Sequence, residues 1–574
     1  MNDINEKKKM SKFEKISIIC IVLLLIFYEF GYCNLKSIAI DHRYNFSLCR
    51  IVIYAFTVFL IIKFGKNIVK NAEKTFESKK EVIFLLFVFS ALIDLIELKD
   101  AIYAQTPMQK IYQMYNFCLL ALAEINGLLF IMYINRDYVN NIIVSILTFG
   151  VVFTYTMPFA HQIDEKTHFL TCLNFAVGNF GLYEGEALSD TIFDQITKNM
   201  PSIDFATSFF DVKCNFNMTK LKFDDSTNIP STYRTPIAYI PGTIGILFAR
   251  LFGGSVADVF LCGRLMNILT FGFLLVITFK ILPYKKKLFY FIFLLPIAMG
   301  IAATYTTDGV TIGLIGIFIA YILKLYDENK EKITMKEFII LCLTYLLVLT
   351  CKDSSYMGIG FLVFILPIRK YFKNNKTMKW IAILLVGIVI LIGTYELKIK
   401  TVSNQGDSRM NNTNSVLQLE YIKQKPSRLF TVYDNFAKES LLKLSWYNNL
   451  NPKYIFGNES YVVNFVLFIY GLYISYIDTS KTFGGKTMIL MFITAVVTFG
   501  ITSFALYWLY TPVGNDTIVG YQTRYLIPFL PLVLASFSSR HRINKDYKDL
   551  SVYDKSALVL GTLTFIDILS QILV

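Results

Sequence analysis

Long runs of mostly apolar residues recur along nearly the whole chain, and no other feature constrains the fold as strongly. An α-helix that crosses a bilayer needs about 20 such residues. Inside lipid, every backbone N–H and C=O must find its partner within the protein, and helices achieve this within one segment. The sequence therefore predicts an all-α polytopic integral membrane protein. The candidate spans are 15–32, 50–65, 82–98, 112–134, 141–159, 256–281, 287–304, 309–326, 335–350, 354–369, 379–397, 460–477, 486–510, 522–538 and 555–573.

Composition and charge agree with a membrane protein. Hydrophobic residues make up 55% of the 574 residues and charged residues 17%, whereas soluble domains average about 45–50% apolar and about 25% charged. The net charge of +14 would also suit a nucleic-acid-binding protein. The lysines and arginines, however, lie in short clusters between apolar runs, as cytoplasmic loops require. We therefore expect membrane lipids, and no nucleic acid, among the partners.

The basic clusters predict the orientation of the spans. Lys7, Lys8 and Lys9 precede the first run without a small-residue cleavage site, so this run is expected to be a retained helix with a cytoplasmic N-terminus. Later clusters then fall repeatedly on the cytoplasmic side. They are Lys66/Lys70/Lys74/Lys79/Lys80, Lys285/Lys286/Lys287, Lys330/Lys332/Lys336, Arg369/Lys370/Lys373/Lys376/Lys379 and Arg540/Arg542/Lys545/Lys548.

This orientation requires that the apolar segment 236–252 does not cross the bilayer. The segment contains two prolines and two glycines, with Gly253 just beyond it, and we interpret it as an interfacial or re-entrant helix on the outer surface. The alternative, that it spans and a weaker candidate does not, stays open. Two long external loops result, 160–255 and 398–459, and loops of such length often carry function.

The chain is expected to have two parts. Residues 1–140 would form an N-terminal extension of about four transmembrane helices, and residues 141–574 a membrane domain with the two external loops. The nine cysteines have no metal-binding spacing. Cys172 and Cys214 share an external loop and could pair, which the sequence leaves undecided. The oligomeric state is left open as well.

The first candidate site follows the span 141–159. Asp164, Glu165 and His168 would share one face of a helix just beyond the bilayer. Such a group can hold a divalent metal, Mg²⁺ or Mn²⁺, through Asp164 and Glu165, or one carboxylate can act as a general base. Acidic residues are also favoured at any helix N-terminus by the helix dipole. Two interpretations therefore stay open: a catalytic or metal-binding group, or the solvated start of a helix.

Further candidates lie on the same predicted face. Arginines at interface depth suit a phosphate or diphosphate head group, although an arginine such as Arg250 can equally snorkel to lipid head groups. Polar residues in tight hairpins are common, but an ionisable residue beside apolar runs is a functional candidate. The candidate substrate-binding residues are Tyr233, Arg234, Tyr239, Arg250, Arg264, Asp308, Lys352, Tyr356, Gln522, Arg524 and Tyr525.

The order of these motifs resembles a bacterial membrane family, the domain of unknown function 2142. The resemblance covers about residues 142–540 and rests on the Asp-Glu and His-Phe pairs, a Pro-x-x-Tyr-x-Pro segment from Pro236, the Arg-Leu-x-Asn span, Asp308, the Lys352–Tyr356 hairpin, and Gly520–Tyr525. Thr523 stands where that family usually has glycine. The family is similar in layout to the C superfamily (GT-C fold) of membrane glycosyltransferases, which implies a GT-C-like helical bundle whose external loops carry interfacial helices.

The resemblance implies an inverting glycosyltransferase of the bacterial cytoplasmic membrane, with its active site outside. A polyprenyl-phosphate-linked sugar would be the donor, and a cell-surface glycan or glycolipid the acceptor. Asp164 or Glu165 would serve as base or metal ligand, and Arg524 or Arg264 would bind the donor phosphate. A transporter or flippase, a polymerase or ligase of lipid-linked saccharides, and an inactive scaffold are the alternatives. A transporter should carry charge at mid-membrane, where this chain has little apart from Asp94 and Glu124.

Overall fold

The computed structural model confirms the all-α fold class. It describes residues 12–33, 47–56, 58–59, 102–133, 137–157, 165–176, 236–328, 332–352, 355–373, 412–438, 461–478, 480–538 and 559–565, with isolated positions between 84 and 99 and between 379 and 387. Within these residues every element is a helix, and five helices are long and apolar enough to cross a membrane. The chain is therefore a multi-pass membrane protein.

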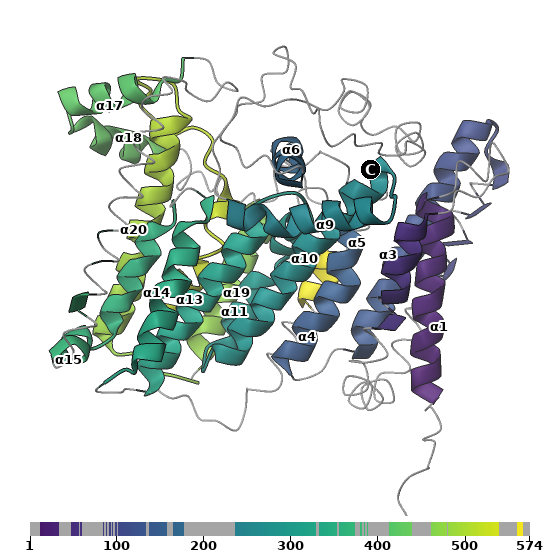
Figure 1. The fold of residues 1–574 in the computed structure, drawn as a ribbon, viewed down its shortest axis with the longest axis horizontal. Helices are drawn as coiled ribbons and strands as arrows, with labels where there is room; N and C mark the ends of the chain where they lie inside the picture. Colours follow the sequence, from purple (N-terminus) through teal and green to yellow (C-terminus); the bar gives the residue numbers. More distant parts are fainter. Residues whose placement is uncertain are drawn as a thin grey trace, which may run out of the picture.

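The centre of the molecule is a pair of long helices, α10 (Val256–Ile281) and α13 (Asp308–Glu328). On one side α10 packs against α4 (Tyr138–Ser145) and α5 (Val151–Thr156), and on the other α13 packs against α14 (Met335–Leu349). Figure 1 shows these helices side by side across the bundle. Most of α13 is buried by protein, so α13 forms the inside of the bundle rather than a lipid-facing surface.

Among the described residues, three of the expected spans are interrupted or are not α-helical over most of their length. Residues 287–304 form α11 (Lys286–Phe293) and α12 (Pro296–Ala302) instead. Pro296 has no N–H to continue the first helix, and it holds Leu295 in an extended conformation with ψ 141°. Residues 522–538 form η10 (Thr523–Tyr525) and the short α21 (Leu530–Ala535), because two prolines interrupt the run.

The third correction concerns the expected span 354–369, which is the 3₁₀ helix η6 (Met357–Ile365) followed by α15 (Ile368–Lys373). η6 lies against α20 (Gly485–Leu509), and a Cβ at Gly358 would come within 2.7 Å of the Thr498 backbone. At about 2.0 Å rise per residue, a 3₁₀ helix reaches further per residue than an α-helix. η6 therefore covers a longer distance along α20 than an α-helix with the same number of residues would.

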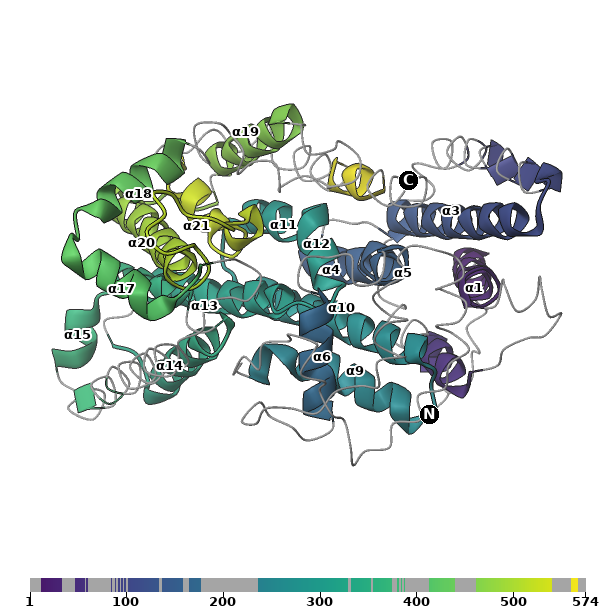
Figure 2. The ribbon, with the colours of Figure 1, turned by 90° about the horizontal axis from the view of Figure 1, so that it is seen from above.

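Several short helices gather at one end of the bundle, which we call the outer end. They are α6 (Glu165–Ala176), η4 (Pro236–Tyr239), α9 (Ile240–Leu251), α17 (Ser415–Gln424) and α18 (Arg428–Phe436). α9 packs on α10 and α6, and Figure 2 shows α6 and α9 beside α10 from above. With 12 residues, α9 is shorter than the about 20 that a crossing needs.

The N-terminal helices stand beside α4 and α5 (Figure 1). They include α1 (Lys12–Ile26), the π-helical segment η1 (Phe27–Cys33) and α3 (Pro107–Tyr133). α3 contacts both α4 and α5, so the N-terminal helices pack directly on the rest of the bundle.

A buried lysine joins two helices at the opposite end. Lys285 has a left-handed backbone (φ 59°), and its Nζ donates to the Ser475 carbonyl at 3.3 Å and to the Asp478 carbonyl, at the end of α19 (Tyr461–Ile477). Burial lowers the pKa of Lys285, and the Asp478 carboxylate opposes that shift. The lysine thereby satisfies helix-end carbonyls that have no partner within α19.

Replacing Lys285 with Met is expected to reduce the free energy of unfolding by about 1–3 kcal/mol, because buried carbonyls lose their donor. Thermal unfolding in detergent would measure the change. Lys286→Met, at the neighbouring half-buried lysine, is the control and should have a smaller effect. Equal effects of the two variants would contradict the role of Lys285.

Candidate functional site

Three charged residues from separate elements meet at the outer end. Asp308 is the first residue of α13, Lys352 follows α14 with a left-handed backbone (φ 49°), and Arg524 lies in η10. Lys352 Nζ forms an ion pair with Asp308 Oδ1, and Arg524 Nε lies 3.3 Å from Asp308 Oδ2. Asp308, Lys352 and Arg524 were all predicted site residues, and the structure brings them together.

In this cluster two cations share one carboxylate. The side chains of Asp308 and Arg524 are 5% and 7% exposed, whereas that of Lys352 is 21% exposed. The three residues together carry a net charge of +1 in a largely desolvated place, where electrostatic attraction is strong. Such a cluster attracts an anion that can approach from the side of Lys352.

Aromatic residues support the two cations. Lys352 Nζ lies 4.1 Å from the centroid of the Tyr525 ring, and Arg524 Cζ lies 5.4 Å from it. The Tyr356 hydroxyl donates to the Tyr525 carbonyl at 3.1 Å, and the Gln522 carbonyl accepts from the Tyr525 N–H at 3.0 Å. The predicted residues Tyr356, Gln522 and Tyr525 therefore shape the η10 turn and hold its position.

Gly520 begins this turn, and the site needs a glycine there. Its φ is +82°, which side-chain-bearing residues rarely adopt, and a Cβ would lie 2.4 Å from the Tyr510 ring. The Gly520–Tyr525 motif is thus explained by backbone geometry at its first residue and by charge at Arg524.

A second ion pair is completely enclosed. Arg264 Nε and Nη2 donate to the two carboxylate oxygens of Glu165 at 2.8 and 2.7 Å, and both side chains are 0% exposed. Arg264 Nη1 also donates to the carbonyls of Thr154 and Met157 at 3.1 and 2.7 Å. This bidentate pair, together with its two carbonyl acceptors, ties α6 to α10 and α5.

The enclosed pair changes two expectations. Glu165 was a candidate base and metal ligand, and Arg264 a candidate phosphate-binding residue. In this structure each is the partner of the other and neither is accessible, so the geometry gives them a positioning role. The reason is that Arg264, although near the outer end of α10, faces α6 and α5 rather than the surface.

Tyr305 connects the enclosed pair to the charged cluster. Its backbone N–H donates to Glu165 Oε1 at 3.1 Å, and its hydroxyl donates to the Val259 carbonyl at 3.1 Å. Burial raises the pKa of the Tyr305 phenol well above its ordinary value, so the hydroxyl stays protonated and keeps donating. Asp308 lies three residues further along the chain, and the pair therefore helps to place it.

The remaining predicted residues of the first external loop hold α6 against α9. His168 Nδ1 and the Tyr239 hydroxyl lie 2.9 Å apart, and Arg250 Nη1 donates to the Ala176 carbonyl at 3.3 Å, where α6 ends. These contacts lie within one pair of packed helices. These contacts of His168, Tyr239 and Arg250 hold helices together. They do not involve the charged cluster around Asp308.

Some predicted residues lie outside the part of the chain that the structure describes: Asp164, Tyr233, Arg234 and Cys214. Among the described residues, no group of three or more His, Cys, Asp or Glu side chains could hold a metal ion. The predicted metal ligand Glu165 is already occupied by Arg264.

Three charged residues that the sequence patterns did not single out form a further buried network: Glu29, Arg50 and Asp258. Glu29 lies in the first apolar run, Arg50 at the start of the second and Asp258 in the first turn of α10. Each could have been noticed as a charge at the edge of an apolar run, but nothing in the sequence shows that the three meet.

Comparison with models of known protein families gives a match over most of the chain. The family model described as "predicted membrane protein (DUF2142)" matches residues 147–533, about two thirds of the chain. The matched region includes the enclosed pair and the charged cluster. No curated protein and no solved structure matches.

Proposed function

The chain belongs to the DUF2142 family of predicted membrane proteins, and from this premise we propose that it is a glycosyltransferase of a bacterial cytoplasmic membrane. It would transfer a sugar from a polyprenyl-phosphate-linked donor to a cell-surface glycan or glycolipid on the outer face. The outer end of the bundle would face the cell exterior, with the N-terminus in the cytoplasm.

The observation that carries the proposal is the shared carboxylate of the charged cluster. Arg524 and Lys352 both contact Asp308 beside the apolar helices, with Lys352 the more exposed. A lipid phosphate needs cations at the membrane interface, and an arginine fork matches phosphate oxygens well. The phosphate of a polyprenyl donor could therefore replace Asp308 as the partner of both cations while its chain stays in lipid.

The proposed reaction needs a base for the acceptor hydroxyl and positive charge for the phosphate leaving group. Asp164, directly before Glu165 in the sequence, would take the proton from the acceptor hydroxyl, whose oxygen attacks the anomeric carbon. The bond between that carbon and the phosphate oxygen breaks, and its electron pair stays with the phosphate. Arg524 and Lys352 would stabilise the charge that develops there.

Replacing Arg524 with Ala is expected to weaken the binding of polyprenyl phosphate by about 10- to 100-fold, since a hydrogen bond to a charged group contributes about 1.5–3 kcal/mol. Binding would be measured on the purified protein in nanodiscs, with polyprenol as the uncharged comparison. Arg428→Ala, in the outer helix α18, is the control. Equal binding of polyprenol and polyprenyl phosphate by the wild type would contradict a phosphate site.

A transfer assay separates this function from its rivals. Purified protein in liposomes would receive a radiolabelled polyprenyl-phosphate sugar and a glycan or glycolipid acceptor. A transferase forms a new glycosidic bond and releases polyprenyl phosphate. A flippase would move the labelled lipid across the bilayer without changing it, and a polymerase or ligase would transfer whole saccharide chains. A scaffold would do none of these.

A further inference from the structure

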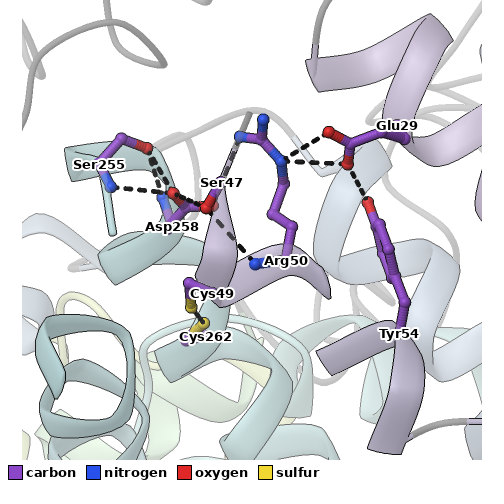
Figure 3. Close-up of polar contacts among 8 residues, drawn as sticks. All are labelled: Glu29, Ser47, Cys49, Arg50, Tyr54, Ser255, Asp258 and Cys262. Atoms are coloured by element: carbon purple, nitrogen blue, oxygen red, sulfur yellow. Dashed lines mark hydrogen bonds and ion pairs between the residues drawn. The ribbon is translucent and has the colours of Figure 1, made fainter. Parts of the chain in front are cut away.

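A buried polar network ties the N-terminal helices to the first turn of α10 (Figure 3). Arg50 Nε lies 3.1 Å from each carboxylate oxygen of Glu29, and Arg50 Nη1 lies 3.6 Å from Asp258 Oδ1. The Tyr54 hydroxyl donates to Glu29 at 2.7 Å. The side chains of these three charged residues are 11% exposed or less. These contacts join the segments that carry Glu29, Arg50 and Asp258 to one another.

The Asp258 end of the network fixes the segment that begins at Ser47. The Ser47 hydroxyl donates to Asp258 Oδ2 at 3.0 Å. Asp258 itself belongs to the capping box that starts α10, in which it accepts from the Ser255 N–H and Ser255 accepts from the Asp258 N–H. The register between residues 47–54 and the start of α10 is therefore set by several contacts.

Two cysteine sulfurs face each other within this same register. Cys49 Sγ lies 3.7 Å from Cys262 Sγ, and the two residues are 0% and 3% exposed. Figure 3 shows the sulfurs pointing toward one another below the polar network. Cys49 follows Ser47 by two residues, and Cys262 follows Asp258 by one helical turn. A disulfide has an S–S distance of about 2.05 Å, so the two sulfurs would have to approach each other further for a bond to form.

We propose that Cys49 and Cys262 are oxidised to a disulfide that locks the N-terminal helices onto α10. The inference rests on the orientation given under the proposed function, because Ser255 and the sulfurs one to two turns below it then lie toward the oxidising side of the membrane. Each thiol loses one proton and one electron. The disulfide of a thiol oxidoreductase accepts the two electrons and two protons and becomes a dithiol.

The order of events follows from burial. In the packed structure neither sulfur is accessible to another protein, so oxidation must precede the closing of the N-terminal helices against α10. The polar network would then hold the two segments in the register that the new bond requires. Once formed, the cross-link would close a long chain loop and be shielded from reductants.

Peptide mapping of the full chain in membranes of its native host tests the proposal. Free thiols would be alkylated with N-ethylmaleimide under denaturing conditions without reductant, and the digest analysed by mass spectrometry. The expected result is a linked peptide pair containing Cys49 and Cys262, lost in Cys49→Ser and kept in the control Cys342→Ser. Recovery of both cysteines as alkylated peptides, or a link from Cys262 to a different cysteine, would overturn the proposal.

Thermal unfolding supplies a second readout that does not depend on digestion. Reductant present during unfolding is expected to lower the wild-type midpoint by on the order of a few degrees and to leave that of Cys49→Ser unchanged. An equal reductant effect on both proteins would also overturn the proposal. If the protein transfers sugar but the two cysteines are not linked, only the disulfide proposal is refuted. If the cysteines are linked but no sugar is transferred, only the glycosyltransferase proposal is refuted.

Discussion

Replacing Asp164 with Asn is expected to lower the rate of sugar transfer by about a hundredfold to ten-thousandfold, the range that a general base contributes. The amide keeps the size of the carboxylate but cannot accept the proton of the acceptor hydroxyl. The rate would be measured with a polyprenyl-phosphate sugar in nanodiscs, together with the thermal unfolding midpoint. We expect the midpoint to stay close to that of the wild type.

A second variant makes this test sharper. Asp164→Glu keeps a carboxylate and should retain more activity than Asp164→Asn, although the longer side chain displaces the base. Unchanged glycan product from Asp164→Asn would mean that the proposed base is wrong, and would favour a polymerase or ligase. Activity that depends on added Mg²⁺ or Mn²⁺ and is lost in the same variant would instead assign Asp164 to metal binding.

The neighbouring carboxylate should behave in the opposite way. Glu165→Gln is expected to reduce the free energy of unfolding by about 3–5 kcal/mol, because it leaves the fully buried Arg264 without its charged partner. Urea or thermal unfolding in detergent would measure the loss. Activity per folded molecule should fall much less than in Asp164→Asn.

Two further variants serve as controls for the enclosed pair. Removing both charges, with Glu165→Gln and Arg264→Met together, should be less destabilising than the sum of the two single changes, since no unpaired charge remains. Lys481→Ala breaks the ion pair with Asp327 at 2.8 Å, in which both side chains are partly exposed, and should change stability little. Additive effects in the double variant would show that Glu165 and Arg264 are not coupled.

Helix limits could be predicted where the chain itself signals them. The predicted span 256–281 coincides with α10, because Ser255 and Asp258 form a capping box at its start and Pro283 follows its end. Apolar content alone wrongly predicted a continuous membrane-spanning helix at 287–304, 354–369 and 522–538. Hydrophobicity shows that a segment can enter lipid, but prolines and close packing on neighbouring helices decide whether it is continuous.

The candidate site was predictable in its members but not in its pairings. Asp308, Lys352 and Arg524 were selected because each lies at the end of an apolar run on the same predicted face, and the end of a helix is where such residues can meet. Arg264 was selected as an arginine at interface depth just inside the next span, yet it pairs with Glu165 inside the protein. Which acid pairs with which base depends on helix rotation and packing, and a single sequence does not contain that information in a readable form.

The shared carboxylate has a consequence for selectivity. While no ligand is bound, Asp308 neutralises part of the charge of Lys352 and Arg524, so a small anion from solution gains little by displacing it. A ligand that binds must offset the contacts that Lys352 and Arg524 lose with Asp308. The apparent affinity of every ligand is its intrinsic affinity multiplied by the fraction of time in which Asp308 does not hold the two cations. A lipid phosphate gains additional free energy from its chain, which a free phosphate lacks. Asp308 would then compete with every anionic ligand, and anions with a membrane-embedded chain would bind more tightly than soluble anions.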